Sequence, residues 1–160
     1  MSKLIFLTVI TVSVFFASCG GPVNPQVFNN TTIKIFEEAN KTLSEFDSKI
    51  TSGIRANDLA SIAVAADSAL ARVDVQINKM KDLKSPPNGV KYKESVSKFL
   101  ETTKAVAEIG KKYSALGEAY TRAELDAVEK EYSDKKKELS EDLKNVANMQ
   151  IQFAKAVRAR

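Results

Sequence analysis

The chain has 160 residues, of which 24 are Lys or Arg and 20 are Asp or Glu, so its net charge is only +4. Histidine is absent and Cys19 is the only cysteine, which excludes Ser-His-Asp and Cys-His catalytic sites, imidazole zinc sites, histidine-ligated haem and any intrachain disulfide. The small charge excess also argues against a nucleic-acid-binding protein, which would carry a strongly basic patch or stripe.

The N-terminal segment has the parts of an export signal. Residues 1–3 supply a short positive region, and Leu4 to Phe16 is an uncharged, strongly apolar run. A transmembrane helix needs about 20 apolar residues to cross the hydrocarbon core, and this run ends too early for that. A buried core helix would show a polar face, which the run lacks. We therefore interpret residues 1–18 as a signal peptide that is removed.

The end of this segment indicates how it is processed. Phe16-Ala17-Ser18-Cys19 resembles the lipobox of bacterial lipoproteins, in which a bulky apolar residue and two small residues precede the modified cysteine. Phe16 departs from the commoner Leu at the first of these positions. The alternatives are ordinary cleavage after Gly20 and a cysteine that is simply a small buried hydrophobe.

The lipobox resemblance implies that Cys19 becomes the N-terminus and carries a diacylglyceryl thioether and an acylated amine, with palmitate-type chains. The partner so implied is a membrane, which the protein reaches through the lipid on Cys19, with residues 19–24 as the lipidated cysteine and a short tether. Gly20, in place of Asp, resembles the signal for delivery to the outer membrane, so the expected location is the cell envelope, with the outer membrane favoured.

The remainder, residues 25–160, is the size of a single domain, and its richness in Ala, Lys, Glu, Leu and Val favours helices. A first helix is predicted from Asn24 as N-cap and Pro25 at the first helical position, with Gly53 as its stop. Its apolar stripe is predicted to be Phe28, Phe36, Ala39, Leu43, Phe46 and Ile50.

A second helix is predicted to be capped by Asn57 or Asp58 and to end before Pro86 and Pro87, which cannot continue the hydrogen-bond ladder. Its stripe follows steps of three and four residues, and we expect Leu70 to lie at the centre of the core. The stripe comprises Leu59, Ile62, Ala66, Leu70, Val73, Ile77 and Met80.

A third helix is predicted from about Lys91 to Tyr120, and the spacing of Thr121 and Glu124 is that of a capping box that starts a fourth. In the third helix the stripe is Tyr92, Val96, Phe99, Thr103, Val106, Ile109, Tyr113, Leu116 and Tyr120. In the fourth it is Leu125, Val128, Tyr132, Leu139, Leu143, Val146, Met149, Phe153 and Val157, interrupted by Lys135, whose stem is expected to snorkel.

Amphipathic helices with short connections predict an all-α fold, an antiparallel up-down four-helix bundle. Leu143 is expected to be central in its core. The rival interpretation is a long two-helix coiled coil, which the capping box and the mixed Tyr, Phe and β-branched stripes disfavour.

The search for chemistry finds no catalytic residue, no cofactor site and no metal site, so the domain is not expected to be an enzyme. Gly110 and Gly117 are interpreted as close helix contacts or local weak points. Asp67-Ser68-Ala69 resembles the O-glycosylation motif of Bacteroidetes lipoproteins, although its position inside a helix favours chance. The acidic residues beside lysines are interpreted as a solvated salt-bridge face; they are Glu37, Glu38, Glu129, Glu131, Glu138, Glu141 and Asp142.

As a whole the chain resembles small helical surface lipoproteins of Bacteroidetes and spirochaetes, which implies no particular activity. We expect a non-enzymatic interaction or structural module, with a protein or glycan as partner. The alternative is a carrier that holds a lipid or another apolar ligand between its helices. Ala63, Ala66 and Ala69 favour such a cavity, whereas the bulky Phe28, Phe36, Phe46, Phe99 and Phe153 are large enough to fill it.

A basic end facing the membrane or a partner is also expected, because the start of the first helix follows Cys19 closely. Lysines and arginines at helix C-termini are also explained by the helix dipole, but Lys91 and Lys93 stand at a helix N-terminus, where cations are disfavoured. The residues expected at this end are Lys81, Lys84, Lys91, Lys93, Lys155, Arg158 and Arg160.

Overall fold

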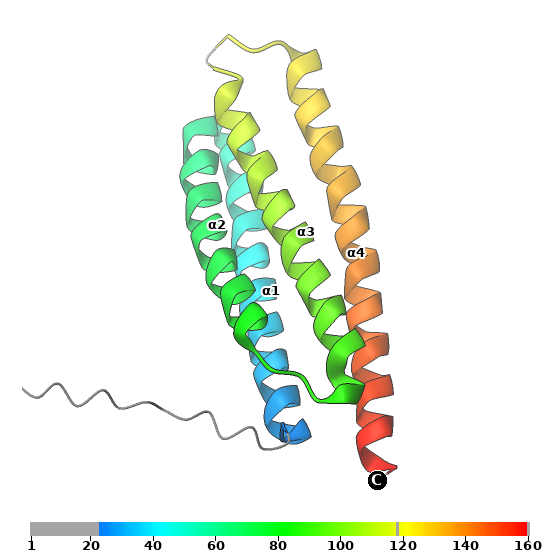
Figure 1. Cartoon of the computed structure of the whole chain (residues 1–160). Coiled ribbons are helices and arrows are strands. Elements are labelled where there is room, and N and C mark those ends of the chain that lie inside the picture. Colours follow the sequence, from blue (N-terminus) through cyan, green and yellow to red (C-terminus); the bar gives the residue numbers. More distant parts are fainter. Residues whose placement is uncertain (1–22, 118, 160) are drawn as a thin grey trace, which may run out of the picture.

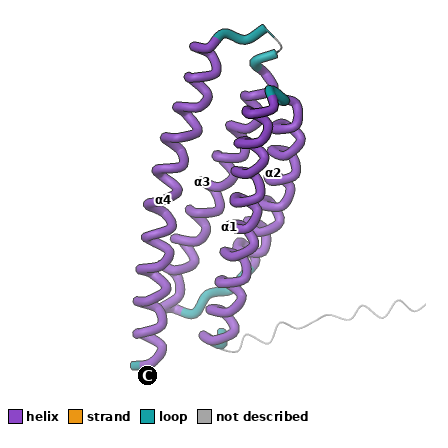
Figure 2. The backbone as a smooth tube through the Cα atoms, turned by 180° about the vertical axis from the view of Figure 1, so that it is seen from behind, coloured by secondary structure: helices purple, strands orange, loops and turns teal. Residues whose placement is uncertain are grey.

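The structure, a computed structural model, describes residues 23–117 and 119–159. Within these residues it consists of helices and their connections (Figure 2). The predicted signal peptide (residues 1–18), Cys19 and Arg160 lie outside the described residues. The helices are α1 (Pro25–Ala56), α2 (Leu59–Asp82), the short 3₁₀ helix η1 (Pro87–Gly89), α3 (Val90–Ala115) and α4 (Arg122–Arg158).

The four long helices run up, down, up and down, which confirms the predicted antiparallel bundle (Figure 1). The close helix pairs are α2 with α3, α3 with α4, and α1 with α2. Helix α3 also packs on α1, so it is the element around which the other three gather. As a result α3 is buried on several sides, and Leu100 and Ala107, outside its predicted stripe, belong to the core.

The helix starts follow the local signals in the sequence. Asn24 Oδ1 accepts hydrogen bonds from the backbone N–H groups of Gln26 and Val27 at 2.9 and 3.2 Å. Asp58 caps α2 by accepting from the N–H of Ser61 at 3.0 Å. The capping box at the start of α4 is formed as predicted, with Thr121 and Glu124 each bonding the other's backbone N–H. These caps satisfy N–H groups that have no partner within their own helix.

Two predicted helix ends are wrong. Helix α1 passes through Gly53 and ends at Ala56, where Asn57 adopts a left-handed conformation with φ 52° and closes the helix. Gly53 instead permits close packing, because a Cβ there would stand 2.5 Å from the side chain of Ile62. Helix α3 ends at Ala115 and not at Tyr120, since Gly117 has φ +71° and lies outside helical geometry.

The core contains most of the predicted stripe residues, with Phe36 packed on Phe99 at a ring-centroid distance of 4.8 Å. The prediction is wrong for Leu70 and Leu143, which were expected at the centre of the core but are only partly buried at its rim. The four tyrosines of the predicted stripes differ in depth, with Tyr92 and Tyr113 fully buried in the core and Tyr120 and Tyr132 packed at its edge.

Candidate functional site

Four parts of the chain meet at one end of the bundle, which we call the basal end and define as residues 23–35, 79–94 and 149–159. They are the start of α1, the end of α2, η1 with the start of α3, and the last turns of α4 (Figure 1). An aromatic cluster joins three of them, since the ring of Phe28 lies 6.1 Å from that of Tyr92 and 5.3 Å from that of Phe153. The predicted topology therefore does bring the basic residues of α2, α3 and α4 to one end.

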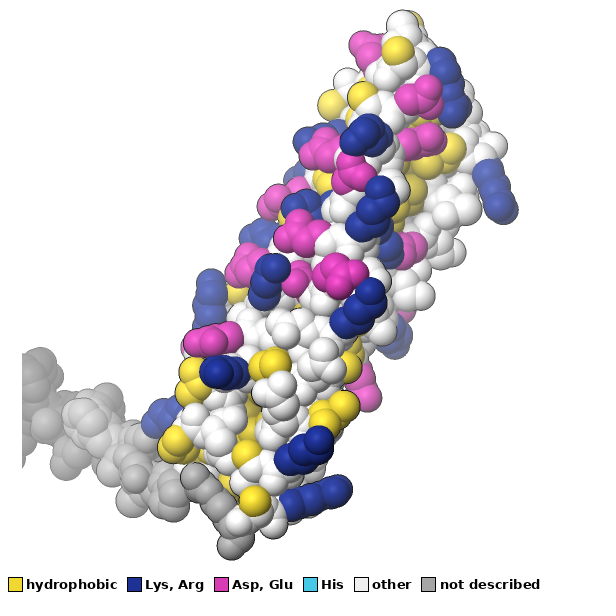
Figure 3. Space-filling view, turned by 90° about the vertical axis from the view of Figure 1, so that its right-hand side faces the viewer, with side chains coloured by type: hydrophobic (Ala, Val, Ile, Leu, Met, Phe, Trp, Pro, Cys, Tyr) yellow, Lys and Arg dark blue, Asp and Glu magenta, His cyan; other side chains and the backbone are white. Residues whose placement is uncertain are grey.

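The basal end carries many cations and few anions. Its acidic residues are Asp82 and Glu94. Its basic residues are Lys34, Lys79, Lys81, Lys84, Lys91, Lys93, Lys155 and Arg158. The lower part of the face in Figure 3 accordingly shows basic and apolar side chains, whereas acidic side chains gather higher on the bundle.

Lys93 has a structural role that the sequence did not reveal. Its ammonium donates hydrogen bonds to the backbone carbonyls of Lys81 at 3.0 Å and Leu83 at 2.5 Å, and so caps the end of α2. Lys93 therefore has a local structural explanation, contrary to the prediction. Lys84 is engaged as well.

The other predicted basic residues are available to solvent. Lys81, Lys91, Lys155 and Arg158 are exposed, and none forms an ion pair within the part of the chain that the structure describes. The same end exposes large apolar side chains, with 61% of Val27, 44% of Val90 and 54% of Ile151 accessible. A surface that combines unpaired cations with apolar side chains suits an interface between water and lipid.

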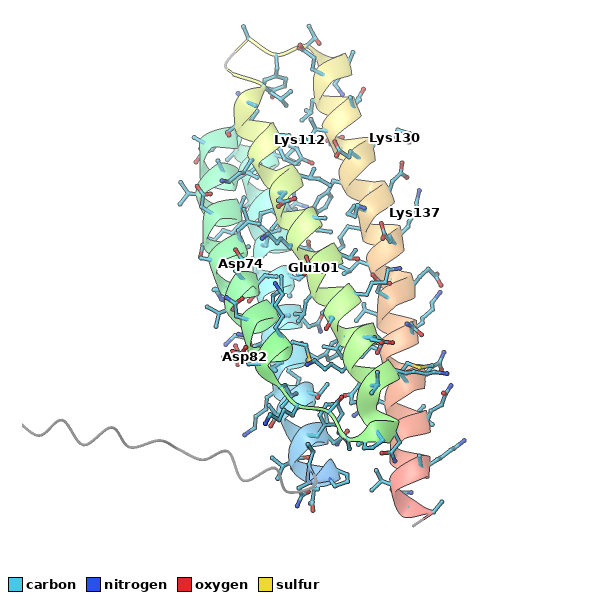
Figure 4. The ribbon with its side chains drawn as sticks, in the orientation of Figure 1. Asp74, Asp82, Glu101, Lys112, Lys130 and Lys137 are labelled. Atoms are coloured by element: carbon cyan, nitrogen blue, oxygen red, sulfur yellow. The ribbon has the colours of Figure 1, made fainter. Side chains whose placement is uncertain are left out.

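The upper part of the bundle is different, because most of its lysines and arginines are paired with acids, although Lys41, Lys49 and Arg55 form no ion pair within the described residues. Lys112 contacts Glu131 at 2.6 Å across α3 and α4, and Lys135 contacts Glu138 at 2.6 Å. Lys130 and Lys137 lie on the outer side of α4 (Figure 4), and both pair with Asp134, whose pKa they lower to about 2. The ion pairs confirm the predicted salt-bridge surface for Glu129, Glu131, Glu138 and Glu141, whereas Glu37 and Glu38 are exposed but form no ion pair within the described residues.

Asp142 does not belong to that surface, contrary to the prediction. Its side chain is 4% exposed and lies between α4 and α3. Thr102 donates a hydrogen bond to one carboxylate oxygen at 2.6 Å, and the ammonium of Lys98 lies 3.1 Å from the other. The bond to Asp142 raises the pKa of Lys98. A buried carboxylate must be paired in this way because an unpaired buried charge is costly.

A second polar group joins α1 to α4, which are not closely packed. Tyr132 donates to one carboxylate oxygen of Asp47, and Lys136 pairs with the other. Burial and then the bond to Asp47 raise the pKa of Tyr132, and burial raises that of Tyr92 to about 12. Tyr132 and Tyr92 are therefore protonated at neutral pH, whereas a tyrosine that acts as a catalytic base has to be deprotonated there.

A groove of about 460 Å³ lies between α1 and α2, well above the basal end. It is mainly apolar, with Ala65 and Ala69 of α2 facing Phe46 of α1. Its lining is Thr42, Glu45, Phe46, Lys49, Ser61, Val64, Ala65, Ser68, Ala69 and Arg72. Ser68 and Ala69 of the candidate glycosylation motif are thus part of its wall.

The bundle interior at the same level is closely packed. A Cβ on Gly110 would stand 2.5 Å from Phe46 and 2.9 Å from Ala66. Ala66 therefore serves a close approach of α2 and α3 and is not part of the lining of the groove. This confirms that Gly110 is a close helix contact.

Among residues 23–117 and 119–159, no cluster of three or more His, Cys, Asp or Glu side chains is placed to hold a metal ion. None of the helices in these ranges has both the length and the apolar character to cross a bilayer. Comparison with known proteins finds no matching family model, no matching curated protein and no matching solved structure.

Proposed function

We propose that this chain is a lipoprotein of the bacterial envelope whose helical bundle is a non-enzymatic interaction or structural module, anchored by lipid on Cys19. The observation that carries the proposal is the position of Val23, which follows Cys19 closely in sequence and leads into the acid-poor, partly apolar basal end. An anchor at Cys19 would bring that end, and no other, to the membrane.

The length of the tether supports this orientation. An extended chain spans at most about 3.6 Å per residue, so the few residues between Cys19 and Pro25 keep the lipid within roughly 20 Å of the start of α1. A helix rises about 1.5 Å per residue. The 32 residues of α1 would therefore carry the opposite end of the bundle tens of ångströms from the bilayer. The ion-paired upper surface would then face partners in solution.

The anchor is tested by replacing the acceptor thiol. Cells that express Cys19→Ala and are fed a labelled fatty acid should show no label on the chain, because the diacylglyceryl group is attached to that sulfur. Ser18→Ala is the matched control, since it keeps a small residue before the cysteine and should be labelled as the parent is. Equal labelling of Cys19→Ala and the parent would contradict the proposal.

The groove between α1 and α2 favours a second candidate function, the carriage of an apolar ligand. Its volume falls within the range of small-molecule sites, about 300–1,000 Å³. Lys49 is exposed at its rim and has no ion pair within the described chain, so it is available to a carboxylate headgroup. A fatty acid fits these features, with its chain in the groove and its carboxylate at Lys49.

A fluorescent fatty acid provides the test of this second function. We expect saturable binding by the parent and its loss in Ser68→Trp, because an indole there would occupy the groove. Asn78→Trp is the control, since Asn78 is exposed on the same helix outside the groove and should leave binding unchanged. Equal binding by both variants would exclude the groove as the site.

A further inference from the structure

We infer that the basal end is a docking surface for anionic lipid headgroups, so that the bundle binds a negatively charged bilayer directly and not only through its lipid. The inference deepens the proposed anchoring, which would hold this end beside a membrane. The docking itself requires no acyl chain. It can therefore be tested apart from the anchor.

The direction in which each helix runs distinguishes this inference from the simplest alternative, namely that the basal charges only complement the helix dipoles. If charges only complemented helix dipoles, acidic residues would gather at helix starts and basic residues at helix ends. The two helices that start at the distal end each have an acid there, with Asp58 capping α2 and Glu124 in the first turn of α4. Arg122 places a cation in that same turn of α4, but it has a local partner, Asp126, at 2.9 Å. The two helices that start at the basal end have no such acid. Helix α1 is capped by the neutral Asn24, and neither α1 nor α3 has an acid in its first turn.

The basal end is thus poor in acids whichever way a helix runs through it. Lys91 even places a cation in the first turn of α3, where the dipole disfavours it. Lys155 and Arg158 lie in the last turns of α4, so the cations come from separate elements around the same end. A negatively charged partner outside the protein accounts for Lys91, Lys155 and Arg158 together, whereas the helix dipole accounts only for the two cations of α4.

The two acidic residues of the basal end, Asp82 and Glu94, do not lie at its outermost part, which we call the tip. Helix α2, with Asp82 as its last residue, ends short of the start of α1 and the end of α4 (Figure 4). Glu94 lies beyond the first turn of α3. The tip is therefore formed by the start of α1, by η1 with the start of α3, and by the end of α4.

The exposed apolar residues indicate a bilayer as the negatively charged partner. Val27 and Val90 lie in the first turns of α1 and α3, and Ile151 lies on α4 two turns before its end. A soluble polyanion would give these side chains no apolar contact. A bilayer offers headgroup charge and acyl chains together, and each basic residue near an anionic surface strengthens binding by about fivefold.

The experiment uses the chain from Gly20 to Arg160 without lipid, whose helices and core lie entirely within the described residues. It is mixed with vesicles of phosphatidylcholine alone or with added phosphatidylglycerol, and the bound fraction is measured by co-sedimentation. We expect binding to the anionic vesicles at low salt, loss of that binding at high salt because charge is screened, and no binding to neutral vesicles.

A charge-matched pair of variants locates the surface. The triple change K91E, K155E and R158E should weaken binding to anionic vesicles by more than 100-fold, since three attractions become repulsions. The control changes K41E, R55E and K111E alter the net charge equally at exposed sites on α1 and α3 above the basal end, and should leave most of the binding intact. Circular dichroism spectra establish that both variants remain helical.

Three results would overturn the inference: no binding to anionic vesicles at low salt, equal binding to neutral vesicles, or equal losses in the two triple variants. Binding to heparin without binding to vesicles would also overturn it and assign the end to an acidic glycan. None of these outcomes affects the anchor, because the labelling of Cys19 is tested in cells and the vesicle assay uses a chain without lipid.

Discussion

Replacing Leu139 with alanine should lower the free energy of unfolding by about 2–5 kcal/mol, whereas the same change at Leu143 should cost clearly less. Both leucines lie on α4, one turn apart. Leu139 is 1% exposed and belongs to the core, while Leu143 is partly buried at its rim. Truncating Leu139 leaves a cavity that close-packed neighbours cannot fill, but solvent and mobile side chains can fill the space left at position 143.

The two variants are compared by denaturant unfolding under identical conditions. Lys137→Ala is the surface control, since the side chain of Lys137 is 75% exposed and its pairing with Asp134 contributes little in water. Its midpoint should match that of the parent closely. If Leu139→Ala and Leu143→Ala lost equal stability, the assigned depth of α4 in the bundle would be wrong.

Local chemistry explains why the helix starts could be predicted. A cap such as Asn24, Asp58 or Thr121 acts on N–H groups two or three residues away, so the sequence carries the whole signal. Helix ends were harder, because glycine serves two purposes. Gly53 permits close packing inside α1, whereas Gly117 takes a left-handed conformation after α3, and nothing near either residue in sequence distinguishes the two roles.

Burial depth depends on the neighbouring helices, which periodicity cannot identify. Helix α4 packs mainly on α3, so only a narrow part of its stripe is deeply buried and Leu143 falls at the rim. Helix α3 has helices on several sides, which buries Leu100 and Ala107 beyond the predicted stripe. The direction of each apolar face could therefore be predicted, but its width could not.

The basal end was predictable to the extent that it follows from up-down topology. The role of Lys93 was not, because it depends on the carbonyls of Lys81 and Leu83 at the end of a different helix. The groove between α1 and α2 was missed for a similar reason. Its lining combines Ala65 and Ala69 of α2 with Thr42 and Phe46 of α1, and the spacing within either helix does not predict which residues of the other helix lie beside them.

The buried carboxylate of Asp142 should show strong coupling to Thr102. Thr102→Val removes the hydroxyl that donates to the carboxylate at 2.6 Å, while the shape of the side chain is kept. A buried charged group then loses a hydrogen bond, and we expect the free energy of unfolding to fall by about 1–3 kcal/mol. Lys98 cannot compensate, because it already pairs with the other oxygen and is itself 60% exposed.

Removing the carboxylate of Asp142 as well should restore much of the stability that Thr102→Val loses. In the double variant Thr102→Val with Asp142→Leu, no buried polar group is left without a partner, because the ammonium of Lys98 belongs to a side chain that is 60% exposed to water. Apolar replacements of buried ion pairs are often neutral or stabilising. The stability of Asp142→Leu alone should lie between that of Thr102→Val and that of the double variant. This change leaves only the buried hydroxyl of Thr102 without its partner, and that hydroxyl can turn toward a backbone carbonyl of its own helix. Denaturant unfolding of the parent, the two single variants and the double variant gives the coupling energy. Strictly additive losses would show that Asp142 does not depend on Thr102, and that water or Lys98 alone satisfies its charge.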